Sequence, residues 1–138
     1  MYKDGKPVLV HLRKEKMRVL VFGSKDYTDY NEFIRQMTVL IDDRKHWHPD
    51  DKEYIFIHKG MRGAEDMVTE YIGKVEKMIR SNGYKIKEEL VRDKSSFSDV
   101  TLIESNPDFA LVFGNSERNR SCLKLLEAYG IPHRFVKE

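Results

Sequence analysis

The segment Gly23-Ser24-Lys25-Asp26-Tyr27 carries residue types that bind anions. It directly follows the apolar block 19–22, so a glycine, a hydroxyl and a cation come where a strand would end. A glycine there lets backbone N–H groups approach a phosphate, and the hydroxyl and ammonium groups could add a hydrogen bond and a charge. The structural alternative is an ordinary strand-to-helix turn in which Thr28 or Asp29 caps the helix. Both interpretations are kept for this segment.

A second segment, Gly60-Met61-Arg62-Gly63-Ala64-Glu65, carries a stronger signal for anion binding. Two glycines three residues apart bracket Arg62 just before the most regular helical pattern in the chain. Such a loop presents N–H donors at a positive helix end, with an arginine placed to bind an anion bidentately. The spacing differs from a dinucleotide fingerprint, and the Lys-Ser/Thr of a P-loop is missing. Glu65, in the first helical turn, is also favourable on dipole grounds alone.

A third segment, Gly114-Asn115-Ser116-Glu117-Arg118-Asn119, follows the apolar block 109–113. In an open parallel sheet, ligands bind beyond the carboxyl ends of the strands, where successive crossovers diverge. We therefore expect the first and third segments to line one crevice, with the second alongside. The predicted ligand-binding residues are Gly23, Ser24, Lys25, Asp26, Tyr27, Gly60, Arg62, Gly63, Ala64, Glu65, Gly114, Asn115 and Ser116.

The elements that must position these residues follow from apolar patterning. Continuous apolar blocks at 19–22, 54–57 and 109–113 predict strands covered on both faces, a shorter block at 135–136 predicts a last strand, and the alternating segment 84–87 predicts an edge strand. Apolar residues spaced three and four apart predict helices over 30–41, 64–79 and 123–129, with a short helix at 99–104.

This alternation predicts an α/β fold: a doubly wound, mostly parallel five-stranded Rossmann-like sheet with helices on both faces. Right-handed crossovers favour a strand order that places the 19–22 strand centrally beside the 109–113 strand. The 54–57 and 84–87 strands then run outward on the other side.

Length and charge narrow the function classes. The 138 residues suit one domain, and 25 Lys plus Arg against 23 Asp plus Glu leave a formal net charge of +2 at pH 7. This balance excludes a strongly basic nucleic-acid arm. No apolar run approaches the ~20 residues that span a bilayer, so we expect a cytoplasmic protein without a membrane partner. We expect residues 1–16 to form an N-terminal extension, with an edge strand at 8–12 as one option, and residues 17–138 to form a single domain.

The remaining reactive residue types support structural roles. His58 at a strand end is expected to be a satisfied structural histidine, and Cys122 a packed helix residue. His46 and His48 share a loop, but no third ligand accompanies them, so neither a metal site nor a cofactor is predicted. A single cysteine also excludes an intramolecular disulfide framework.

The segments 17–27 and 58–65 together resemble the small bacterial and phage members of the SLOG superfamily. These are Rossmann-like domains related to the Lonely Guy phosphoribohydrolases and the DNA-processing protein A recombination mediators. The family pattern is a strand ending in Gly-Ser-Arg-Asp-Tyr, then a strand ending in His-Gly-x-Ala-x-Gly-Ala-Asp. With Pro107-Asp108 and Gly130-Ile131-Pro132 in later family positions, the resemblance covers roughly residues 17–136. It implies a nucleotide or nucleotide-derived ligand in the predicted crevice.

The sequence also departs from the family's pattern. Lys25 replaces Arg, Lys59 replaces Gly, and Glu65 replaces Asp. The family's Gly-Gly-x-Gly-Thr phosphate loop appears as residues 114–119 with one glycine, and Glu117 brings a negative charge there unless it turns away or pairs with Arg118. The catalytic glutamate of the phosphoribohydrolases has no counterpart at 120–123. The resemblance therefore implies the fold more strongly than the catalysis.

We accordingly expect a binding module or sensor for a nucleotide or nucleotide-derived ligand. The alternative is a phosphoribohydrolase-like enzyme that cleaves the N-glycosidic bond of a nucleoside monophosphate, for which Glu65 and Glu117 are the candidate catalytic carboxylates. A nucleic-acid or protein-partner role ranks last because the net charge is only +2. Self-association into a homo-oligomer is implied by the family alone.

Overall fold

The computed structural model describes residues 16–137, which alternate strictly between strands and helices. The elements are β1 (Lys16–Gly23), α2 (Tyr30–Trp47), β2 (Glu53–His58), α3 (Ala64–Ser81), β3 (Lys85–Leu90), α4 (Ser96–Glu104), β4 (Phe109–Phe113), α5 (Glu117–Ala128) and β5 (His133–Val136). Strand β1 thus begins one residue inside the expected extension. The optional edge strand at 8–12 lies outside the described residues.

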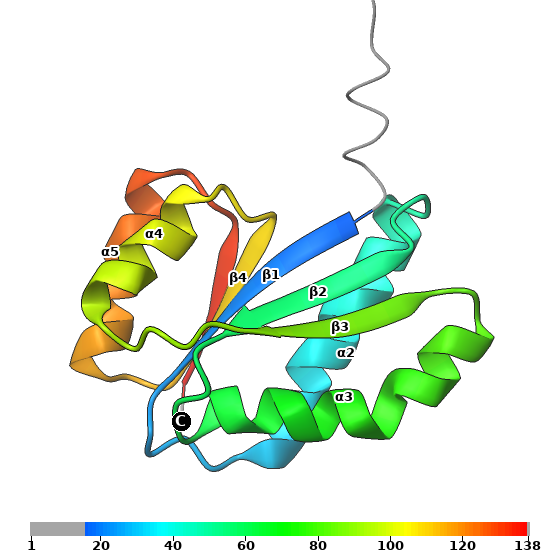
Figure 1. Cartoon of the computed structure of the whole chain (residues 1–138), viewed down its shortest axis with the longest axis horizontal. Coiled ribbons are helices and arrows are strands. Elements are labelled where there is room, and N and C mark those ends of the chain that lie inside the picture. Colours follow the sequence, from blue (N-terminus) through cyan, green and yellow to red (C-terminus); the bar gives the residue numbers. More distant parts are fainter. Residues whose placement is uncertain (1–15, 138) are drawn as a thin grey trace, which may run out of the picture.

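The five strands form one sheet in the order β3-β2-β1-β4-β5 (Figure 1). Every neighbouring pair is parallel, so the prediction of a doubly wound sheet with β1 at its centre and β4 beside it is confirmed. The chain moves outward from β1 through β2 to β3, then crosses back to β4 and moves outward again to β5. The crossovers therefore diverge between β1 and β4, whose last residues Gly23 and Phe113 are paired in register.

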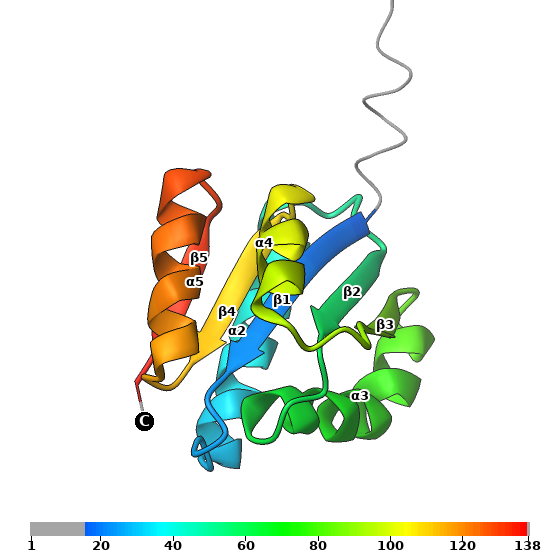
Figure 2. The same ribbon diagram turned by 60° about the vertical axis from the view of Figure 1, so that its left-hand side comes forward.

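Helices cover both faces of the sheet, as predicted. Helices α2 and α3 pack on one face, and α4 and α5 pack on the other (Figures 1 and 2). Strand β1 explains why both faces need cover: Val19 and Val21 belong to the core under α2 and α3, whereas Leu20 and Phe22 belong to the core under α4 and α5. All of these side chains are at most 1% exposed, and their continuous apolar run reflects this two-sided burial.

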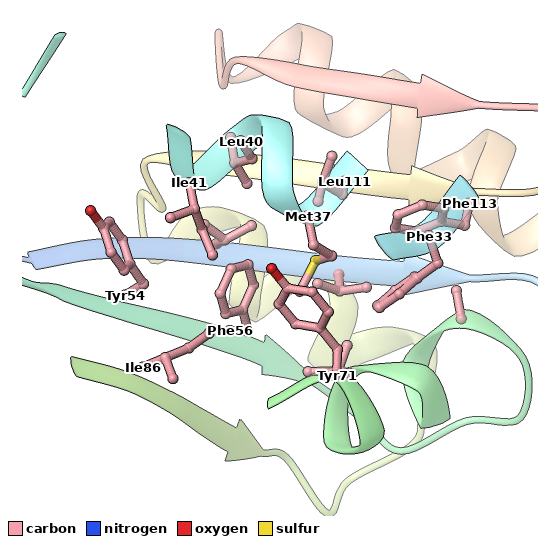
Figure 3. Close-up of a cluster of buried hydrophobic side chains, with 14 of the residues drawn as sticks. Phe33, Met37, Leu40, Ile41, Tyr54, Phe56, Tyr71, Ile86, Leu111 and Phe113 are labelled. Atoms are coloured by element: carbon pink, nitrogen blue, oxygen red, sulfur yellow. The ribbon is translucent and has the colours of Figure 1, made fainter. Parts of the chain in front are cut away.

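The larger core lies between the sheet and the α2–α3 layer. Four residues of α2, at spacings of three and four, point toward Tyr71 of α3 and toward the sheet (Figure 3). They are Phe33, Met37, Leu40 and Ile41. Asp29 begins this helix by accepting a hydrogen bond from the Glu32 N–H at 3.0 Å, which confirms the capping role considered for it.

Two helices begin earlier than the sequence pattern predicts. Helix α4 begins at Ser96 rather than 99, and its early residue Phe97 is 74% exposed. Helix α5 begins at Glu117 rather than 123 and opens with polar residues. Apolar periodicity misses these first turns because the residues that they bury are polar: Ser98 and Asp99 in α4, and Asn119 in α5. None of the helices in the described part of the chain is long and apolar enough to span a membrane.

Candidate functional site

The glycine loops after β1 and before α3 lie in direct contact. A Cβ at Gly23 would come 2.7 Å from the Cβ of Ala64, and one at Gly63 would come 2.1 Å from the carbonyl oxygen of Ser24. Gly63 also has a φ of +89°, which L side chains rarely adopt. The Ser24 N–H donates to the Phe113 carbonyl at 2.8 Å, which ties the same loop to the end of β4. The predicted meeting of these segments is therefore found.

The carboxylate of Glu65 holds this junction together. Its side chain is fully buried, and Oε2 accepts from the Gly23 N–H at 3.1 Å and from Arg118 Nη1 at 2.6 Å. Oε1 accepts from the Lys59 N–H at 2.9 Å and from the Met61 N–H at 3.4 Å. Both oxygens are therefore occupied by groups from the ends of β1 and β2 and from α5. This contact set gives Glu65 a positioning role.

Glu65 belongs to a buried cluster of two cations and two carboxylates. Arg118 forms a two-bond contact with Asp99, from Nε to Oδ2 at 2.9 Å and from Nη2 to Oδ1 at 3.0 Å. Lys59 Nζ donates to Asp99 Oδ1 at 2.8 Å and to the Ser95 carbonyl at 2.6 Å. The exposed fractions of Lys59 and Asp99 are 1% and 4%. The charges balance, as buried ionic groups require.

The ionisation of this cluster follows from its contacts. Burial disfavours the charged form of Asp99, but hydrogen bonds from Arg118 and Lys59 outweigh burial and hold its pKa below the ordinary value of 3.8. Burial likewise disfavours charged Arg118, yet Asp99 and Glu65 outweigh it and raise the pKa of the guanidinium above its ordinary value. We infer that the salt bridges of Asp99 and Arg118 persist at neutral pH.

A cavity of about 400 Å³ opens above this cluster, at the carboxyl ends of β1, β2 and β4. We call it the strand-end cavity. Its lining residues are Gly23, Ser24, Lys25, Asp26, Gly60, Met61, Arg62, Lys94, Ser116 and Arg118. Of its four cations, Arg118 is neutralised from below, whereas Lys25, Arg62 and Lys94 are exposed and make no ion pair within residues 16–137. Asp26 supplies the one carboxylate of the lining, so the cavity attracts anions.

The structure brings most of the predicted ligand-binding residues into this lining. Those that line the cavity are Gly23, Ser24, Lys25, Asp26, Gly60, Arg62 and Ser116. The other predicted residues lie outside the lining. Tyr27 is buried against Phe113, Gly63 and Ala64 form the loop contact, and Glu65 lies in the buried cluster. The Gly114 N–H donates a hydrogen bond to the Val136 carbonyl, and the Asn115 side chain accepts one from Arg120. The exposed Glu117 lines a neighbouring cavity between α4 and α5.

Sequence reasoning missed Lys94, Lys59 and Asp99. Lys94 lies in a polar connection between β3 and α4 that has no glycine motif, and no local signal marks it. Lys59 follows β2 directly, and a charge at the end of a buried strand could have indicated a buried partner. Its partner Asp99 is 40 residues away along the chain. Residue spacing within a short motif cannot reveal an ion pair such as Lys59–Asp99, whose members lie far apart along the chain.

The other reactive residue types have structural surroundings. His58 is 2% exposed; its Nε2 lies 2.5 Å from Glu88 Oε2, and its Nδ1 accepts from the Gly60 N–H at 3.0 Å. This is the satisfied structural histidine that was expected. Cys122 is buried in α5, and burial raises the pKa of its thiol to about 12. Within the described part of the chain, no group of three His, Cys, Asp or Glu residues could hold a metal ion.

A second cavity of similar size lies at the opposite, amino-terminal ends of the strands. Its volume is about 440 Å³, and two of its charged lining residues, Arg44 and Asp51, form a salt bridge of 2.5 Å. Among residues 16–137, those that line it include no glycine. The strand-end cavity therefore remains the candidate site. No family model matches the chain, and the comparison with curated proteins finds no matching relative.

We predict that Gly63→Ala destabilises the protein, because the new methyl group would meet the Ser24 carbonyl and the backbone would retain an unfavourable φ. The expected loss in the free energy of unfolding is about 3 kcal/mol. Gly73→Ala is the matched control, because Gly73 lies within α3 with open space around it. That variant should gain about 1 kcal/mol from helix propensity. Urea denaturation followed by circular dichroism measures both, and equal stabilities would contradict the close loop contact.

We also predict that Asp99→Asn costs about 3–5 kcal/mol at neutral pH, because it leaves the buried Lys59 without its counter-charge. The double variant Lys59→Met/Asp99→Asn should recover part of this loss, since Arg118 and Glu65 still balance each other. Asp42→Asn, at an exposed position of α2, is the control and should change stability by less than ~0.5 kcal/mol.

The pH dependence of unfolding provides an independent check of the same cluster. Because the folded-state pKa of Asp99 lies below 3.8, its stabilising contribution is complete above that pH and is lost as the pH falls through the folded-state value. The stability difference between the original protein and Asp99→Asn should therefore shrink in acid. A difference that stays constant down to the lowest measurable pH would refute the ion-pair assignment.

Proposed function

We propose that the chain is a binding module for a phosphate-bearing nucleotide or nucleotide-derived ligand, held in the strand-end cavity. The observation that carries this proposal is the gathering of Lys25, Arg62 and Lys94 around one cavity, with no ion pair to any of them within residues 16–137. Cations on a protein surface usually alternate with carboxylates. Three unpaired cations around a concave site favour an anion as the occupant.

The loop geometry supports phosphate in particular. Gly63 is the N-cap of helix α3 and supplies no side-chain hydrogen bond, and Gly23 at the end of β1 lets the loop after that strand approach the start of this helix closely. Arg62 offers a planar fork of donors that matches a phosphate, whereas Lys25 and Lys94 add charge without fixing orientation. The site lies where the crossovers diverge between β1 and β4, which is the usual ligand position in this class of sheet.

The size of the cavity supports a small molecule rather than a polymer. Its volume of about 400 Å³ falls within the roughly 300–1,000 Å³ of typical small-molecule sites. Met61 adds an apolar side chain to a lining that also exposes polar and charged groups. A nucleotide combines an anionic end with a larger neutral part, so it uses both kinds of surface.

The resemblance to the SLOG superfamily agrees with this proposal, and we propose membership of that superfamily on the same grounds. The family's two best-matched motifs lie at the ends of β1 and β2, where a Rossmann-like ligand would bind. The departures from the family's pattern argue against phosphoribohydrolase activity. A phosphoribohydrolase needs a carboxylate beside the anomeric carbon, yet both oxygens of Glu65 are occupied. Glu117 lines the neighbouring cavity instead. We therefore favour binding over hydrolysis.

We predict that Arg62→Ala and Lys25→Ala each weaken nucleotide binding about tenfold, because each removes one charge-assisted contact. Calorimetric titration of the full chain with AMP, GMP and ADP-ribose measures this effect. Incubation of the same mixtures followed by chromatography for free base separates binding from turnover.

The matched control is Lys77→Ala, which removes an exposed cation from the opposite end of α3. It should leave the affinity unchanged and thereby show that net charge alone does not explain the loss. Absence of binding by every nucleotide in the panel would overturn the proposal, as would equal affinities for Arg62→Ala and Lys77→Ala.

A further inference from the structure

A third cavity, of about 570 Å³, lies between α4 and α5. It is the neighbouring cavity that Glu117 lines, and it adjoins the strand-end cavity at Arg118. We call it the interhelix cavity. Arg118 lines both cavities, and Asp99 and Glu65 hold its guanidinium in place. A ligand that lies beside this fixed side chain would therefore contact a residue that lines both cavities.

The two cavities differ in electrostatic character. The strand-end cavity has three cations that form no ion pair with any residue from 16 to 137, whereas the cations and carboxylates of the buried cluster cancel beneath the interhelix cavity. The charge that remains in the interhelix cavity is the exposed carboxylate of Glu117. A phosphate group is attracted to the first cavity and repelled from the second. An uncharged group with hydrogen-bond donors suits the second.

The apolar part of the interhelix cavity suits a flat ring. Phe97 on α4 lines it and is 74% exposed, so most of its ring is available for contact. Val100 and Leu125 provide apolar contacts from the two helices, and Ser121 provides a hydroxyl. Stacking of a nucleobase on an exposed aromatic ring is a common source of affinity, worth ~1–3 kcal/mol per base.

We propose that the interhelix cavity holds the base of the nucleotide whose phosphate lies in the strand-end cavity, and that it selects guanine. This inference rests on the proposed function. The base stacks on Phe97, the ribose lies beside Arg118, and Glu117 accepts hydrogen bonds from the base edge. The opposite polarities of the two cavities set the direction in which the ligand lies.

The selection for guanine follows from hydrogen-bond chemistry. An ionised carboxylate only accepts hydrogen bonds, so it favours a base edge with adjacent donors. Guanine places its N1–H beside its 2-amino group, and both can donate to the two oxygens of Glu117. Adenine and cytosine place their amino group beside an acceptor nitrogen, and uracil places its N–H between two carbonyls. Hypoxanthine keeps the N1–H and lacks the amino group, so it isolates one of the two bonds.

The test is calorimetric titration of the full chain with GMP, IMP, AMP, UMP and ribose 5-phosphate. We expect GMP to bind about tenfold more tightly than IMP, because one hydrogen bond to a charged group is lost, and AMP and UMP to bind still more weakly. Glu117→Gln should abolish the preference for GMP over IMP. Phe97→Ala should weaken GMP binding about tenfold and leave ribose 5-phosphate binding unchanged. Both side chains are exposed, so neither variant is expected to impair folding.

The outcomes separate this inference from the proposed function. Arg62→Ala should weaken GMP and ribose 5-phosphate alike, because it acts on the phosphate. If GMP and ribose 5-phosphate bind equally and Phe97→Ala changes neither, the base site is wrong and the phosphate site stands. If UMP or AMP binds as tightly as GMP, the selection for guanine is wrong. If neither GMP nor ribose 5-phosphate binds, the proposed function itself fails.

Discussion

The structure depends most on one buried carboxylate. The Glu65 side chain is fully buried, where a polar group is tolerated only if its lone pairs are used, and the ends of β1 and β2 and the start of α5 supply the donors. The same contacts place the three loops around the strand-end cavity. The hydrogen bonds that stabilise the buried Glu65 therefore also assemble the site. If the loops separated, Glu65 would be exposed to water or would lose its hydrogen-bond donors.

Much of the fold was predictable from local pattern. The apolar block that forms half of β1 is buried on both faces, and this explains its lack of alternation. The alternation of strands and helices, together with right-handed crossovers, was sufficient to place β1 beside β4. The first turn of α4 was not predictable, because Phe97 faces solvent while the buried residues Ser98 and Asp99 are polar. The start of α5 was missed for a similar reason, because the residue that its first turn buries is the polar Asn119.

The residues of the site that follow the strand ends could be predicted from the sequence. The ion pairs between residues far apart along the chain could not. Gly23, Arg62 and Ser116 line the cavity because the carboxyl ends of parallel strands share one edge. The sequence left open whether Glu117 pairs with Arg118; the partners of Arg118 are Asp99 and Glu65, which are 19 and 53 residues away along the chain. Several carboxylates were available to that arginine. The packing of α4 against α5 brings Asp99 to Arg118, and the position of the first turn of α3 brings Glu65 to it.

The charge balance of the buried cluster restricts how this protein can evolve. Lys59 and Asp99 are almost completely shielded from water. A neutral replacement of Asp99 leaves Lys59 without its counter-charge, and a neutral replacement of Lys59 leaves the cluster with one more carboxylate than cations. Homologous proteins should consequently retain both Lys59 and Asp99 or replace both of them together. Lys25 and Arg62 face solvent and are free of that restriction. The ligand preference of the strand-end cavity can therefore change through Lys25 and Arg62 while the buried cluster stays the same.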